Sequence, residues 1–204
     1  AAGDLDRAIN TAGLVLTHQP PADRELERVA WTVTAHARFD QGRYPEAEEA
    51  YLSLRGYELA PELRAQVDGR IAAAIYRQAE AAQAAGQVDR AVADFLRITA
   101  AVPGAEIGPN ALYDAATLLY NQQRWGESAD LLRRFRREFA GHGFNDQVTV
   151  KLAESLRQDG QSGPAAGEYE RLADTASLPD EARRQALWQA AELHAAAGQS
   201  ADEG

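Results

Sequence analysis

The chain has 204 residues, of which 45% are hydrophobic and 25% charged, a composition typical of a folded protein and not of a disordered one. Its 31 acidic residues outnumber its 21 basic residues and give a net charge of −10, which argues against nucleic acid or an anionic membrane surface as the main partner and favours neutral or basic partners. The absence of cysteine excludes disulfides, zinc–thiolate sites and thiol catalysis.

Ten helices are predicted along the chain, because alanine is frequent throughout and no segment alternates in the manner of a strand. The expected ranges are 4–17, 23–41, 44–57, 61–85, 88–101, 109–122, 125–139, 145–159, 162–175 and 179–197. No apolar run reaches the roughly 20 residues that cross a bilayer. We therefore expect an all-α fold without direct membrane insertion. Because methionine is absent, including an initiator, we also expect the sequence to be a fragment of a longer protein.

A glycine recurs between these helices with a period of roughly forty residues, which indicates a repeat of helix pairs. The turn positions are Gly3, Gly42, Gly86, Gln123, Gly160 and Gly198, where Gln123 takes the place of glycine. We expect antiparallel helix pairs that turn at the last five of these positions. The whole chain, 1–204, then forms a single repeat array.

Small residues occupy two fixed positions relative to each turn. Seven residues before the turn stand Ala35, Ala79, Ala116, Ala153 and Ala191, and five residues after it stand Ala8, Ala47, Ala91, Ser128 and Ala165. Small side chains let two helix axes approach closely, so these positions are expected to be buried where the pairs cross.

Larger residues fill the neighbouring positions at helical spacing. Eleven residues before the turn stand Trp31, Ile75, Leu112, Thr149 and Leu187. Nine and twelve residues after it stand Ala12, Tyr51, Phe95, Leu132 and Tyr169, and Val15, Leu54, Ile98, Phe135 and Leu172. These residues are expected to supply the buried apolar area between helices.

Together these residues resemble the tetratricopeptide repeat family. One unit matches its pattern with Trp31, Ala35, Gly42, Tyr44, Ala47 and Tyr51, and the next with Gly86, Val88, Ala91, Phe95 and Pro103. The resemblance implies a right-handed superhelix of about ten antiparallel helices. The sequence departs from the family at Gln123 and Ser162, and its period exceeds the family's usual length of about 34 residues.

The longer period, with turns such as Val102 to Gly104 and Gly141 to Gly143, resembles a variant found in bacterial envelope lipoproteins and Tol-Pal-associated periplasmic proteins. This resemblance implies a periplasmic or cell-envelope location.

No group of residues has the spacing of a catalytic or metal site. The histidines His18, His36, His142 and His194 lie in different units, and the segment 160–163 follows a helix and lacks the lysine of a phosphate-binding loop. We therefore expect no enzymatic activity, no metal and no cofactor. The arginines Arg133, Arg134, Arg136 and Arg137 indicate either a solvated helix face or a site for an acidic partner.

The family resemblance implies that the first helix of each unit lines a concave surface. On this surface the sequence places the candidate partner-binding residues Tyr76, Glu80, Tyr113, Thr117, Tyr120, Asn121, Glu154 and Arg157. Aromatic rings with polar and acidic edges suit an extended or helical peptide. The alternative is that the aromatic residues fill the seam between neighbouring first helices.

Some family members bind acidic C-terminal tails through a clamp rich in lysine and asparagine. Thr32 and His36 stand where the first lysine and asparagine of that clamp would be, and the register places no lysine on the inner face. Binding of an acidic C-terminal tail is therefore not expected. The sequence instead predicts a non-catalytic scaffold for a protein or peptide partner, in a bacterial cell-envelope assembly; the alternative is a structural spacer between flanking domains.

Overall fold

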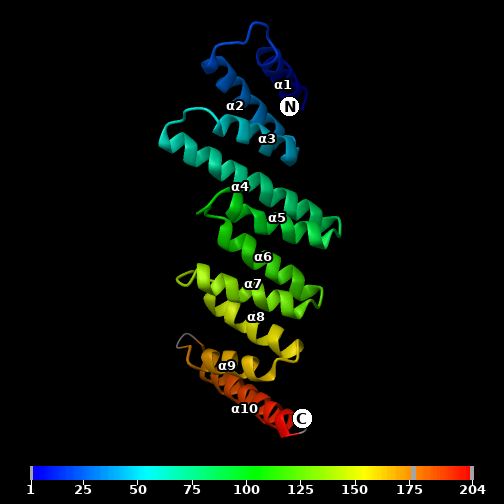
Figure 1. Cartoon of the computed structure of the whole chain (residues 1–204), viewed down its shortest axis with the longest axis vertical. Coiled ribbons are helices and arrows are strands. Elements are labelled where there is room, and N and C mark those ends of the chain that lie inside the picture. Colours follow the sequence, from blue (N-terminus) through cyan, green and yellow to red (C-terminus); the bar gives the residue numbers. More distant parts are fainter. Residues whose placement is uncertain (1, 176–177, 203–204) are drawn as a thin grey trace. The chain divides into compact units, whose positions relative to one another are not determined.

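The computed structural model describes residues 2–175 and 178–202, and these residues form ten helices and no strand (Figure 1). The helices are α1 (Ala2–Leu16), α2 (Arg24–Asp40), α3 (Tyr44–Arg55), α4 (Pro61–Ala84), α5 (Val88–Ala101), α6 (Gly108–Asn121), α7 (Trp125–Glu138), α8 (Asn145–Gln158), α9 (Ser162–Ala173) and α10 (Asp180–Asp202). The predicted all-α fold is confirmed. Apart from the end of α10, helix boundaries lie within about two residues of the expected ones.

The chain divides into two compact units, Ala1–Ala111 and Leu112–Gly204. In unit 1, each of the helices α1 to α4 packs against the helix that follows it, up to α5. In unit 2, α7 packs against α8, α8 against α9 and α9 against α10. The single array over 1–204 remains a prediction.

Four turns between paired helices share one backbone geometry. Gly42, Gly86 and Gly160 have φ values of 73°, 71° and 76°, and Gln123 has a φ of 59°. The residue after each turn donates its N–H to the carbonyl five residues earlier, as in Arg43 to Arg38 and Arg124 to Leu119. This is the hydrogen bond of a Schellman motif, in which a left-handed residue ends the helix. The turns predicted at these four positions, including the one without glycine, are confirmed.

The turn predicted at Gly198 is wrong, because α10 continues through this residue to Asp202. Gly3 likewise lies inside α1. A glycine inside a helix costs only about 1 kcal/mol relative to alanine, and Ala195, Ala196 and Ala197 favour helix before Gly198. In the described chain no following helix packs back against α10, so the glycine alone does not end it.

The small residues lie where the paired helices cross. Ala35, Ala47, Ala79, Ala91, Ala116, Ala153 and Ala165 are each 0% exposed, as predicted. Ser128 is equally buried, and its Oγ donates to the carbonyl oxygen of Ala116 at 2.9 Å. This bond joins the two small positions of one pair, so no room remains there for a larger side chain. Ala8 and Ala191 differ, since Ala8 is half-buried and Ala191 exposed.

Ala79→Leu should destabilise the protein by roughly 1 to 3 kcal/mol, because the added carbons must displace a neighbouring helix in a filled crossing. The control is Ala81→Leu, an exposed position two residues later in the same helix. Urea denaturation followed by circular dichroism measures both. Equal midpoints for the two variants would contradict the assignment of Ala79 to the crossing.

Gln123→Gly should stabilise unit 2 by about 0.5 to 1 kcal/mol, since relief of the left-handed strain at φ 59° exceeds the added entropy of the unfolded chain. The reverse change at the equivalent turn, Gly86→Gln, should lower stability. Chemical denaturation of both variants tests the pair, and a loss of stability in Gln123→Gly would refute the strain argument.

Candidate functional site

The candidate partner-binding residues are divided between the two units. Tyr76 and Glu80 lie on α4 in unit 1, and the other six lie on α6 and α8 in unit 2. The Tyr76 ring packs edge-on against Phe95 of α5 at 5.1 Å between centroids, and Glu80 accepts a hydrogen bond from Arg77 at 2.8 Å. Each of these two side chains is therefore already engaged by its own unit.

Unit 1 has a groove of about 540 Å³ between α2, α3 and α4. Thr32 and His36, which the sequence placed on the inner face, form one wall, and Tyr51 contributes to the groove from α3. The His36 ring packs edge-on against Tyr51 at 5.6 Å, and Tyr51 is 1% exposed. Burial raises the pKa of Tyr51 to about 12, so its hydroxyl stays neutral at physiological pH. Arg70 of α4 also lines this groove and lies over the Phe39 ring at 5.5 Å.

In unit 2, the side chain of Lys151 of α8 lies across two candidate tyrosines of α6. Its Nζ is 4.5 Å from the centroid of the Tyr120 ring and 5.9 Å from that of Tyr113. These are cation–π contacts, and partial burial lowers the pKa of Lys151. The sequence placed no lysine on the predicted inner face, whereas the ammonium group of Lys151 lies over two tyrosines that were assigned to it.

The physical reason for this miss is side-chain length. The candidate residues of the inner face stand ten, six, three or two residues before a turn, whereas Lys151 stands nine residues before Gly160. Its flexible four-carbon stem brings the ammonium group over the rings of the neighbouring helix.

The two tyrosines also pack against side chains of their own unit. Tyr113 contacts Phe135 at 6.3 Å and Phe144 at 5.3 Å, and Tyr120 lies edge-on to Trp125 at 4.8 Å. Both rings are half-buried. Tyr113 thus contributes to the core around Phe135 of α7, while one part of each ring stays accessible. Of the other α6 candidates, Thr117 is half-buried and Asn121 exposed.

Glu154 accepts four hydrogen bonds from three residues. Arg157 donates to it from Nη2 at 2.5 Å and from Nε at 3.1 Å, Gln158 Nε2 at 3.0 Å and the Tyr169 hydroxyl at 3.1 Å. The hydrogen bond from Arg157, with smaller contributions from Gln158 and Tyr169, lowers the pKa of Glu154 to about 2. Glu154 is therefore ionised at physiological pH. It contacts Arg157, which was also predicted to bind a partner, and Tyr169, which the sequence had assigned to packing.

This carboxylate and Arg157 stand at a groove of about 470 Å³ between α8, α9 and α10. Val150, which is 50% exposed, and Leu172 give the groove apolar surface. Gln185 and Gln189 of α10 add amide groups. The arrangement can bury apolar side chains of a ligand and offer donors and acceptors to its backbone.

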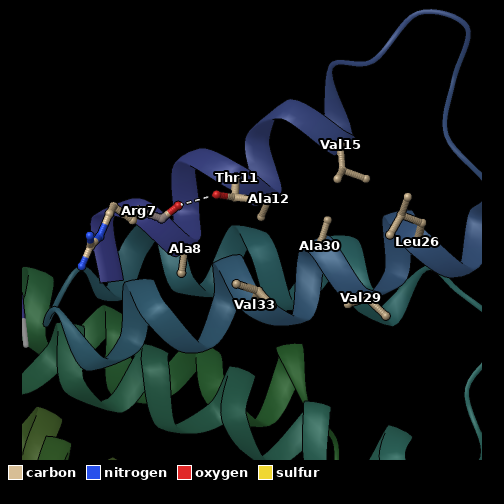
Figure 2. Close-up of a pocket in the computed structure, with 9 residues that line it drawn as sticks. All are labelled: Arg7, Ala8, Thr11, Ala12, Val15, Leu26, Val29, Ala30 and Val33. Carbon is tan, nitrogen blue, oxygen red and sulfur yellow. Dashed lines mark hydrogen bonds between the residues drawn. The ribbon is translucent and has the colours of Figure 1, made fainter. Parts of the chain in front are cut away.

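A third groove, of about 400 Å³, lies between α1 and α2 (Figure 2). It is lined by Arg7, Ala8, Thr11, Ala12, Val15, Leu26, Val29, Ala30 and Val33. Figure 2 shows Ala8 and Ala12 directed from α1 toward α2, while the Thr11 hydroxyl donates back to the carbonyl of Arg7 at 2.9 Å. Because its lining is almost wholly apolar, this groove suits packing more than polar recognition. Its residues follow the ordinary packing pattern of the repeat, so they were not expected to form a binding site.

Three of the four clustered arginines of α7 have acidic partners. Arg133 pairs with Asp130 at 3.1 Å, Arg134 with Glu138 at 2.8 Å and Arg136 with Glu168 of α9 at 2.5 Å. These pairs favour the interpretation of the segment as a solvated and structurally paired helix face.

Among the described residues, no group of three or more histidine, aspartate or glutamate side chains could hold a metal ion. In the same part of the chain, no helix has the length and hydropathy needed to cross a membrane.

Comparison with known proteins gives one family match. Residues 73–105 match the model of the tetratricopeptide repeat, and they cover the second half of α4, the Gly86 turn and α5. No curated protein matches the chain in sequence. The match supports the tetratricopeptide repeat family, whose repeats generally mediate contacts between proteins.

Glu154→Gln should lower the melting temperature at neutral pH, because the charge-assisted bond from Arg157 is weakened. The folded-state pKa of about 2 lies below the ordinary value of 4.5, so the carboxylate contributes its full stability above pH 4.5 and loses it between 4.5 and about 2. The difference from the unmodified protein should therefore shrink over this acid range. Thermal melts against pH measure it, with Glu58→Gln, an exposed loop position, as control. A difference that is independent of pH would contradict the assigned role.

Proposed function

We propose that this protein is a non-catalytic interaction module that binds a peptide or a helix of a partner protein in the groove between α8, α9 and α10. The observation that carries the proposal is the combination, in one groove of about 470 Å³, of apolar surface at Val150 and Leu172 with the Glu154–Arg157 pair. The family match supports the same class of function, because tetratricopeptide repeats typically bind proteins or peptides.

The chemistry of the groove fits a peptide that carries apolar side chains and basic or neutral polar side chains. A groove of this size holds a few side chains, which gives specificity at the level of single residues. Glu154 is ionised and gives the groove a negative charge that attracts a basic side chain, although its oxygens already accept four hydrogen bonds; Arg157 and the two glutamines can donate to carbonyl oxygens.

The tyrosine–lysine patch of Tyr113, Tyr120 and Lys151 is proposed as a second contact for the same partner, with Thr117 and Asn121 at its edge. A large ring contributes contact area with few rotors to immobilise, so partly accessible tyrosines are suitable anchors. In unit 1, Tyr76 and Glu80 and the groove at Thr32 and His36 are proposed to contact the same kind of ligand. The repeat period, which resembles that of bacterial envelope proteins, motivates a cell-envelope assembly as the proposed setting.

Selection of a peptide display library on immobilised protein of residues 1–204 tests the function directly. Fluorescence polarisation of the selected peptides should give saturable binding. Tyr113→Ala with Tyr120→Ala should weaken it by about 2 kcal/mol or more if the rings are anchors. Val150→Asp, which replaces exposed apolar surface of the groove by a hydrated charge, should also weaken binding, whereas Leu14→Asp on α1 changes a more exposed residue outside all three grooves and should not.

The outcomes separate the alternatives. Loss of helix content in the double tyrosine variant would show that the rings belong to the seam between helices. Unchanged binding in a fully helical double variant and in Val150→Asp would exclude this surface. Failure to select any peptide would favour a structural spacer without a ligand of its own.

A further inference from the structure

The Tyr51 hydroxyl is a buried donor without a hydrogen-bond acceptor. Tyr51 is 1% exposed, and its hydroxyl oxygen has no hydrogen-bond partner among residues 2–175 and 178–202. An unpaired polar group in a protein interior is unfavourable, and most buried hydroxyls therefore have a partner. Tyr51 lines the groove of about 540 Å³ between α2, α3 and α4, so a ligand bound there can supply the missing acceptor.

The repeat contains a second tyrosine at the same position, and the hydroxyl of that tyrosine has an acceptor. Tyr51 and Tyr169 each stand nine residues after the turn of their helix pair. The Tyr169 hydroxyl donates at 3.1 Å to the carboxylate of Glu154, which stands six residues before the turn. In the pair of α2 and α3 that position is His36, whose ring lies edge-on to Tyr51 at 5.6 Å. This pair therefore lacks the carboxylate that the pair of α8 and α9 contains.

Both pairs have a guanidinium group beside this position. In α8, Arg157 stands three residues before the turn and donates to Glu154 at 2.5 Å. In α2 the same position is Phe39, and the guanidinium group of Arg70 of α4 lies over the Phe39 ring at 5.5 Å. Arg70 forms no ion pair or hydrogen bond with the residues that the structure describes. The pair of α2 and α3 therefore has the hydroxyl and the cation, but no anion between them.

The charges around the Tyr51 hydroxyl favour an anion. Burial raises the pKa of Tyr51 to about 12, so the hydroxyl is neutral and can donate. The charge of Arg70 lowers this pKa and the charge of Asp40 raises it by less, so the cation has the larger effect at the hydroxyl. Arg70 also lines the groove, whereas Asp40 does not. His36, the other titratable side chain of the lining besides Tyr51, adds no negative charge in either protonation state.

From these observations we infer that the groove between α2, α3 and α4 binds the side-chain carboxylate of an aspartate or glutamate of a partner peptide, with the Tyr51 hydroxyl and the Arg70 guanidinium group as donors. The carboxylate of the ligand takes the place that Glu154 fills in the pair of α8 and α9. The inference rests on the proposed function for the class of ligand. It gives this groove the opposite charge preference from the groove of α8, α9 and α10, where Glu154 itself supplies the negative charge.

The two tyrosines allow a test that requires no ligand. Tyr51→Phe removes a hydroxyl that has no acceptor, so the melting temperature should stay the same or rise. Tyr169→Phe is the matched variant, and it should lower the melting temperature because it removes an existing hydrogen bond to Glu154. A clear fall in the melting temperature of Tyr51→Phe would show that its hydroxyl is already satisfied, and would overturn the inference.

Binding is measured with N-acetylglutamic acid α-methylamide, whose only charge is the side-chain carboxylate, by NMR of isotope-labelled tyrosine at constant ionic strength. The Tyr51 signal, assigned from Tyr51→Phe, should shift saturably, and the corresponding glutamine compound should not shift it. Arg70→Gln should weaken binding by roughly tenfold or more, because a charge-assisted hydrogen bond is lost. His36→Glu places a carboxylate of the chain beside Tyr51 and should abolish binding. Arg64→Gln, an exposed arginine of α4 outside the groove, is the control and should bind normally.

N-acetylalanine, which carries only an α-carboxylate, and inorganic phosphate are the competing probes. Tighter binding of either probe, no saturable shift with the glutamate compound, or an unchanged affinity in Arg70→Gln would each overturn the inference. Val150→Asp changes the groove of α8, α9 and α10 and should leave binding of the glutamate compound unchanged. Because this compound requires no selected peptide, a failed peptide selection counts against the proposed function, and a failure of this compound to bind counts against the carboxylate site.

Discussion

The close crossing of paired helices is the constraint on which the rest of the structure depends. At each inner crossing two small residues face one another, and the Ser128–Ala116 bond shows how little space separates the backbones. Close approach lets the larger residues on either side, such as Tyr51 and Phe95, reach the partner helix. Since dispersion and apolar burial act only at contact distance, the small residues indirectly determine how much the large ones contribute.

A second layer of contacts joins pairs through charge. Arg97 of α5 donates to Glu48 of α3 at 2.6 Å and to Asp94 at 2.8 Å, and Gln78 of α4 donates to the same Glu48 at 2.6 Å. In unit 2, Arg136 of α7 and Glu168 of α9 form the corresponding bridge. The acidic partners are mostly buried, so breaking one side would leave a charge with reduced access to water. These bridges therefore add charge-assisted contacts between successive pairs to the apolar contacts of the crossings.

Most of the fold was predictable because each position of the repeat occurs several times in the sequence, so its residue preference can be recognised. Gln123 was recognised as a turn from its place in the pattern, although its side chain disfavours the left-handed backbone that it adopts. Gly198 shows the converse, since the residue type was right but the second helix that stabilises such a turn is absent from the described chain. The position of a residue in the repeat therefore predicted a turn better than the residue type alone.

The candidate sites were less predictable, because they depend on where long side chains end. Lys151 reaches two rings of another helix, and Tyr169, expected only to pack, also donates to Glu154. The groove between α1 and α2 is lined by residues of the ordinary packing pattern and was not predicted from the sequence.

The repeat separates the residues that maintain the fold from those that give each groove its character. The small positions seven before and five after the turn stay nearly constant, whereas the position nine before the turn is Val33, Arg77, Asp114, Lys151 or Gln189. Because this position does not enter the helix crossing, it can change in charge and size without opening the crossing. A single scaffold can thus present an apolar groove at α1 and α2 and one with both apolar and polar side chains at α8 to α10. Such grooves can take different ligands, because the variable positions determine which ligand fits. The constant positions hold the paired helices together.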